Sequence, residues 1–164
     1  MNQRHKNIIM WSLYAALFFF VMLLQTSVFG RLRFLGVKLS LIPVVLVCVS
    51  VFTGHEAGGL FSLIATVVWY LSGAEDGSIF ILTMTVSGIA AGFICDQFSR
   101  RFLPALGLCL GAILFHEGAV FLMRYYLGAA EGKLILWVLK TAGLSLAAFP
   151  PYYLLAKAIR KAGA

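Results

Sequence analysis

Charged residues are scarce in this chain. Only 12% of its 164 residues are charged and only six are acidic, whereas 62% are hydrophobic and the mean hydropathy is +0.97. Soluble domains carry about 25% charged residues and are roughly half apolar. The composition therefore excludes a soluble globular domain. Uncharged runs of about 20 residues, enough to cross a hydrocarbon core of ~30 Å, indicate membrane-spanning helices.

Residues with recognisable chemistry are also few. Cys48, Cys95 and Cys109 have a spacing that fits neither a zinc site nor a disulfide framework. The His-Glu pairs at 55–56 and 116–117 lack the second His at i+4 that a zinc protease requires. The sequence contains no phosphate-binding loop, dinucleotide-binding glycine pattern or nucleophile elbow. We therefore expect no enzymatic activity, no catalytic or metal-binding residues and no cofactor.

Six apolar runs are separated by short polar turns, which leave no room for a soluble domain between them. The shortest turn, Thr53–Glu56, joins the second and third runs and is typical of a helix reversing at a membrane surface. The sequence predicts an all-α polytopic membrane protein, with residues 1–164 forming a single integral membrane domain. Its six transmembrane helices are expected at approximately residues 7–29, 39–53, 57–72, 79–95, 104–126 and 134–155.

The net charge of +7 comes from cations at the ends of the runs. This placement favours contact with anionic lipid and an orienting role in the bilayer, and it argues against nucleic-acid binding. One side of the membrane would hold seven cations, Arg4, Lys6, Arg100, Arg101, Lys157, Arg160 and Lys161; the other would hold five, Arg31, Arg33, Lys38, Arg124 and Lys133. The positive-inside rule then places both termini in the cytoplasm.

A polar cluster within the apolar runs is expected at His116, Glu117 and Lys140. A charge at this depth costs roughly 2.5 kcal/mol or more, so each charged group should be neutralised, paired or facing a cavity. Glu117 and Lys140 fall at similar depths in the fifth and sixth runs, where an ion pair would lock two helices together. The cluster also fits a partner or small-ligand site, or a proton relay.

Small residues recur at four-residue spacing. Gly54, Gly58, Ser62 and Thr66 share one face of the third helix, Gly88 and Gly92 one face of the fourth, and Gly107 and Gly111 one face of the fifth. Such faces let helix backbones approach closely in lipid. They predict either packing inside the bundle or a docking face for another membrane protein.

The order of these features resembles the rod-shape-determining protein MreD family. The resemblance rests on LLQTSVFG closing the first helix, a short loop with Gly36, a second helix containing Pro43, G-x-x-x-G after a tight turn, LSG ending the third helix, and the C-terminal FPPYYLLAKAIRK. Two acidic positions typical of the family are missing. Residues 39–43 contain no acid, and Val68, Trp69 and Tyr70 stand where the second Asp is expected. The resemblance is therefore to a divergent member.

This resemblance implies a non-enzymatic scaffold in the bacterial inner membrane that serves cell-wall elongation. Its implied partners are MreC, MreB filaments, the glycosyltransferase RodA and the transpeptidase that accompanies RodA. The alternative is the substrate-binding component (S component) of an energy-coupling-factor vitamin transporter, which we expect to share a related helical arrangement. Its Ala-x-x-x-Ala docking motif is absent here, since Phe19 and Phe20 follow Ala15 and Ala16 at i+4. In that case His116, Glu117 and Lys140 would line the ligand pocket.

Overall fold

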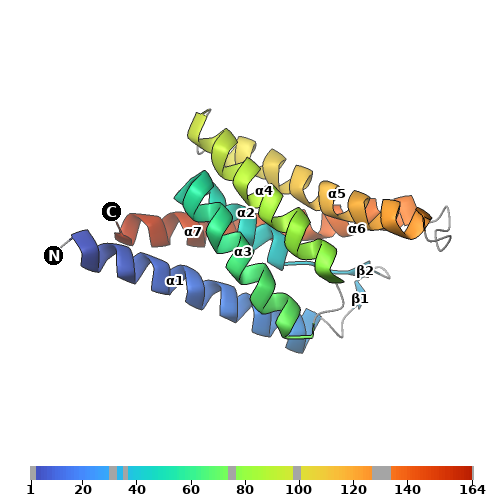
Figure 1. Ribbon diagram of the computed structural model, residues 1–164, viewed down its shortest axis with the longest axis horizontal. Helices are drawn as coiled ribbons and strands as arrows, with labels where there is room; N and C mark the ends of the chain where they lie inside the picture. Colours follow the sequence, from blue (N-terminus) through green and yellow to red (C-terminus); the bar gives the residue numbers. More distant parts are fainter. Residues whose placement is uncertain are drawn as a thin grey trace.

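The computed structural model describes residues 3–29, 33–34, 37–73, 77–97, 101–126 and 134–163. These residues form a bundle of α-helices with one very short hairpin (Figure 1). The elements are α1 (Gln3–Leu24), a π-helical turn η1 (Gln25–Phe29), β1 (Arg33–Phe34), β2 (Val37–Lys38), α2 (Ile42–Thr53), α3 (His55–Leu71), α4 (Gly77–Gln97), α5 (Phe102–Tyr126), α6 (Leu134–Ala147) and α7 (Phe149–Gly163).

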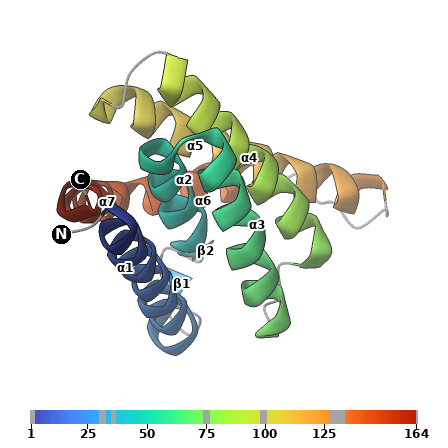
Figure 2. The same cartoon turned by 60° about the vertical axis from the view of Figure 1, so that its left-hand side comes forward.

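The centre of the bundle is α2. Every residue from Ile42 to Phe52 is buried, and the helix packs against α1, α3, α4, α5 and α7. Figure 2 shows α2 with α1 and α7 on one side and α3 and α4 on the other. A helix that is apolar around its whole circumference has no face suited to water and is stable in a protein core. The sequence of α2, IPVVLVCVSVFT, is of this kind.

Three helical segments of the described chain are long and apolar enough to cross a membrane: Arg4–Phe29, Gly77–Gln97 and Phe102–Met123. The expected all-α class is therefore confirmed, whereas the expectation of six spans is supported for these three. At 1.5 Å per residue, the 12 residues of α2 extend only about 18 Å. That is less than a hydrocarbon core of ~30 Å. This helix is shielded by its neighbours along its whole length.

The expected continuous helix over 134–155 is wrong, because the structure divides it into α6 and α7 at Ala148. Pro150 and Pro151 explain the break, since neither can donate a backbone hydrogen bond to the last turn of α6. Both prolines lie in the first turn of α7, where the missing N–H groups would have no intrahelical partner.

The entry into α2 also differs from the expectation, since Leu39–Leu41 is not helical. The side chain of Gln25, in η1, forms hydrogen bonds with the backbone of this segment. Its Nε2 donates to the Leu39 carbonyl at 2.6 Å, and its Oε1 accepts from the Leu41 N–H at 3.0 Å. The β1–β2 hairpin before it pairs Arg33 with Lys38 in what the sequence suggested was a loop.

Both termini lie at one end of the bundle (Figure 1). The Tyr14 hydroxyl in α1 donates to the Ala156 carbonyl in α7 at 3.1 Å, and both residues are completely buried. The turn between α2 and α3 belongs to the same end, because Thr53 lines one hollow together with Asn7 and Arg160.

Candidate functional site

The small residues of α3 and α4 face the interior of the bundle. Gly54, Gly58, Ser62, Thr66, Gly88 and Gly92 are all buried. A methyl group on Gly58 would lie 2.6 Å from Ser50 Cα in α2, and one on Gly88 would overlap the Ser62 hydroxyl. A methyl group on Gly92 would lie 2.6 Å from the backbone of Gly54 and His55. These residues therefore allow α2, α3 and α4 to pack with their backbones in close approach.

Hydroxyl groups within this contact are paired. Ser50 and Ser62 share a hydrogen bond of 3.2 Å between α2 and α3, in which either oxygen can donate. Thr66 Oγ1 donates to the Ser62 carbonyl at 2.7 Å. Buried polar groups are tolerated in an apolar bundle when each finds a partner. The contact between α2 and α3 thus combines close approach with a specific polar register.

Asp96, at the end of α4, holds the start of α3. Its Oδ2 lies 3.3 Å from both the backbone N–H and the ring Nδ1 of His55. A carboxylate at a helix N-terminus accepts from an otherwise unpaired N–H and interacts favourably with the helix dipole. This role of Asp96 was not predicted from the sequence. The signal was present, since two adjacent helices that reverse at one surface bring the end of α4 to the start of α3.

His55 and Glu56 lie next to one further acidic side chain. Their side chains approach to 3.9 Å, and Asp96 is the further carboxylate beside His55. Within the described ranges no group of three or more His, Cys, Asp or Glu residues is arranged to hold a metal ion. The Glu56 side chain is 91% exposed, as expected for a turn at the end of the bundle.

The three side chains of the predicted cluster, His116, Glu117 and Lys140, differ in burial and in contacts. His116 is buried, and its Nδ1 lies 2.8 Å from Thr83 Oγ1 in α4. Its ring meets the Phe80 ring edge-on at 4.9 Å. Glu117 is half-buried and Lys140 is exposed. Among the ion pairs between side chains that the structure describes, none joins these last two.

Thr83 sets the proton arrangement at His116. Its hydroxyl oxygen lies 2.9 Å from the Ile79 carbonyl, one turn earlier in α4. A hydroxyl has one proton, so if it donates to Ile79, then His116 Nδ1 must carry a proton and donate to Thr83. A neutral imidazole satisfies this arrangement. Thr83 was also not predicted from the sequence, because a threonine in an apolar run gives no signal of its partner.

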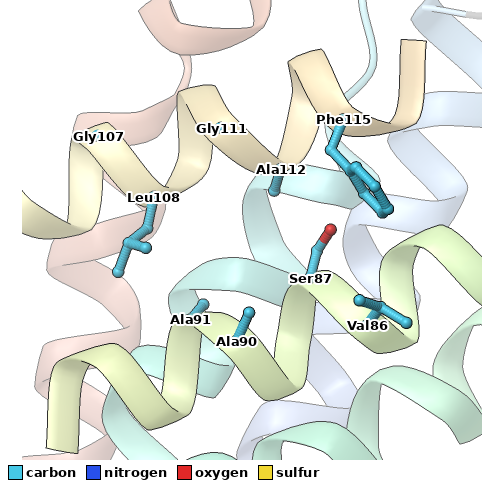
Figure 3. Close-up of a pocket in the computed structure, with 9 residues that line it drawn as sticks. All are labelled: Val86, Ser87, Ala90, Ala91, Gly107, Leu108, Gly111, Ala112 and Phe115. Carbon is cyan, nitrogen blue, oxygen red and sulfur yellow. The ribbon is translucent and has the colours of Figure 1, made fainter. Parts of the chain in front are cut away.

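An open groove lies between α4 and α5, with a volume of about 260 Å³. Figure 3 shows Val86, Ser87, Ala90 and Ala91 of α4 opposite the α5 residues. The full lining is Val86, Ser87, Ala90, Ala91, Gly107, Leu108, Gly111, Ala112 and Phe115. A methyl group added to Gly107 or Gly111 would meet nothing within 4 Å. The small face predicted for the fifth helix is therefore uncovered, unlike those of α3 and α4.

Comparison of the chain with protein-family models, with curated proteins and with solved structures finds no match to any of them.

Proposed function

We propose that this chain is a non-enzymatic scaffold of the bacterial inner membrane that serves the cell-wall elongation machinery, as an MreD-like protein. The sequence order described above supports this proposal, together with an all-helical bundle that contains three long apolar helices. The observation that carries it is the groove between α4 and α5, a surface suited to another membrane helix.

The groove favours an apolar occupant. Ser87 is the one hydroxyl in its lining, and the remaining side chains are aliphatic or aromatic or, at Gly107 and Gly111, absent. Helices associate in lipid mainly by close packing, for which small residues at four-residue spacing are suited. A transmembrane helix of MreC, RodA or its transpeptidase partner would meet a nearly flat strip of backbone here.

The polar contacts of the bundle support a structural role. Ser50 with Ser62, His55 with Asp96 and His116 with Thr83 each join two different helices. Such contacts fix how helices are placed with respect to one another, which a scaffold needs in order to present one surface. We propose that the end of the bundle that holds both termini lies in the cytoplasm. We also propose that the chain crosses the membrane six times, with α6 and α7 together forming the last crossing.

The test fills the groove without disturbing the bundle. Gly111→Leu places a side chain in the groove, and Gly118→Leu is the matched control, since it lies in the same helix, also has open space beyond its Cα, and does not line the groove. We expect Gly111→Leu to abolish recovery of MreC and RodA with the tagged chain from native membranes, and to abolish rescue of rod shape in depleted cells. The control should retain both.

Normal rod shape after depletion of the chain would contradict the scaffold role. Undiminished recovery of both partners with Gly111→Leu would instead remove the groove as the docking site.

A vitamin-binding S component is the alternative, and the buried His116 is the observation that favours it. This imidazole lies one residue after Phe115, which lines the groove. Ligand sites combine an apolar wall with a few convergent polar groups. The groove presents mainly apolar atoms, which suits a charged vitamin less well than a helix. A vitamin that raises the melting temperature of the purified chain would favour this alternative.

A further inference from the structure

A second hollow, of about 310 Å³, lies at the end of the bundle that carries both termini. It is bounded by α1, the turn between α2 and α3, and the last turns of α7. Its lining is Asn7, Met10, Trp11, Phe52, Thr53, Ala57 and Arg160. Its walls are therefore of two kinds, with polar groups from three elements and an apolar part made by Met10, Trp11 and Phe52.

The surroundings of this hollow are strongly cationic. Arg4 and Lys6 lie at the start of α1, and Lys157, Arg160 and Lys161 lie near the end of α7. These helices are held side by side by the hydrogen bond between Tyr14 and Ala156. Among the acids that the structure describes, Glu56 lines a different hollow against α4, and Asp96 contacts His55.

We infer that this hollow binds the phosphate group of an anionic phospholipid. The phosphate would contact Arg160, whose planar guanidinium suits phosphate oxygens, with Asn7 and Thr53 as neutral hydrogen-bonding groups. The glycerol and the first acyl carbons would lie against Met10, Trp11 and Phe52. Arg160, which lines the hollow, is itself half-buried.

The depth of the hollow favours a lipid over a soluble phosphate compound. The first long apolar helix begins at Arg4, so Asn7 is one turn inside its start. This is the level of lipid headgroups and of interfacial tryptophans such as Trp11. A soluble phosphate would gain nothing from the apolar wall, whereas a phospholipid uses both kinds of wall.

The experiment titrates the purified full-length chain, in neutral detergent, with dioleoyl phosphatidylglycerol, with dioleoyl phosphatidylcholine, or with glycerol phosphate, and counts bound molecules by native mass spectrometry. We expect one phosphatidylglycerol to bind in preference to phosphatidylcholine, and glycerol phosphate to bind at least tenfold more weakly than phosphatidylglycerol. Arg160→Gln should weaken phosphatidylglycerol binding about fivefold to tenfold, because one cation near a membrane surface contributes about that factor.

Lys161→Gln is the matched control, since it removes the same charge from the next residue, which is exposed and does not line the hollow. It should change binding less than twofold. Asn7→Ala tests the site from α1, and should weaken binding even if Arg160→Gln lowers the yield of folded protein.

Three results would overturn the inference. Equal binding of both phospholipids would show that the hollow does not distinguish an anionic headgroup from a zwitterionic one. Equal losses from Arg160→Gln and Lys161→Gln would indicate diffuse attraction to a cationic surface. Equal affinity for glycerol phosphate and phosphatidylglycerol would make the ligand a soluble phosphate compound.

Discussion

Replacing Gly92 with alanine should separate α4 from the turn between α2 and α3. An ideal Cβ at this position would lie 2.6 Å from three backbone atoms, the Gly54 carbonyl carbon and the His55 N and Cα. Ordinary contact begins at 3.4 Å, so the atoms must move apart by 3.4 − 2.6 = 0.8 Å. Backbone atoms cannot rotate away as a flexible side chain can. The displacement therefore falls on the packing of two helices.

The turn has little freedom to yield. The Gly54 N–H donates to the Ser50 carbonyl at 3.0 Å, and the Gly58 N–H donates to the Gly54 carbonyl at 2.8 Å. Overpacking of this kind typically costs 1–3 kcal/mol, and loss of the His55–Asp96 contact adds about 1 kcal/mol. Alanine regains about 1 kcal/mol as a better helix former than glycine. We expect a net loss of about 1–3 kcal/mol in the free energy of unfolding.

Gly107→Ala is the matched control. It makes the same chemical change in the neighbouring helix, where nothing lies within 4 Å of the new methyl group. The clash is absent and the helix-forming gain remains, so this variant should be neutral or more stable by up to about 1 kcal/mol. The two glycine-to-alanine changes are therefore expected to differ in sign.

The chain carries its own reporters of unfolding. Cys48, Cys95 and Cys109 are free thiols that are between 0% and 3% exposed. A fluorogenic maleimide added during heating in detergent should react only as the bundle opens. We expect the midpoint of labelling to fall by several degrees in Gly92→Ala and to stay level or rise in Gly107→Ala. A Gly92→Ala midpoint equal to or above that of the parent chain would refute the packing account.

Three further predictions use the same assay or a topology reporter. Thr83→Val should lower stability by about 0.6–1 kcal/mol through loss of the 2.8 Å contact to the α5 imidazole. Thr85→Val should not, because Thr85 Oγ1 is buried and has no hydrogen-bond partner among the described residues. Equal effects of the two variants would contradict this. Tyr14→Phe should cost about 1 kcal/mol by removing the α1–α7 bond to Ala156, and an unchanged midpoint would argue against that bond. Reporters fused after Gly73 and at the C-terminus should report opposite sides of the membrane, and a shared side would exclude the proposed crossings.

Some properties of the fold could be predicted from the sequence and others could not. Composition and run length were enough for an all-helical chain, because only paired backbones are stable in lipid. They were not enough to distinguish a lipid-exposed helix from α2, which is apolar because other helices surround it. The division at Ala148 could have been predicted from Pro150 and Pro151, since their effect on hydrogen bonding is local.

The His116 cluster shows why depth alone does not identify partners. Counting residues from the ends of two runs puts Glu117 and Lys140 at similar levels. Consecutive residues of a helix, however, point about 100° apart, so His116 can face α4 while its neighbour does not. In the structure the buried contact is with Thr83. The rotation of each helix about its axis is set by packing against the other helices. It therefore cannot be predicted from the sequence of that helix alone.

Pairs of glycines at four-residue spacing are packed against other helices in α4 but are uncovered in α5, and this difference bears on function. Four-residue spacing puts Gly88 and Gly92 on one face of α4, and Gly107 and Gly111 on one face of α5. The first pair meets Ser62 and the α2–α3 turn, so its close approach is already used within the bundle. Among the described residues, nothing lies within 4 Å of a methyl group added to either glycine of the second pair. Glycine stabilises a helix less than alanine does. Close packing in the folded chain offsets this loss of stability in α4 but not in α5. A membrane helix seated in the α4–α5 groove would supply the missing contact, which is why we propose the docking surface there.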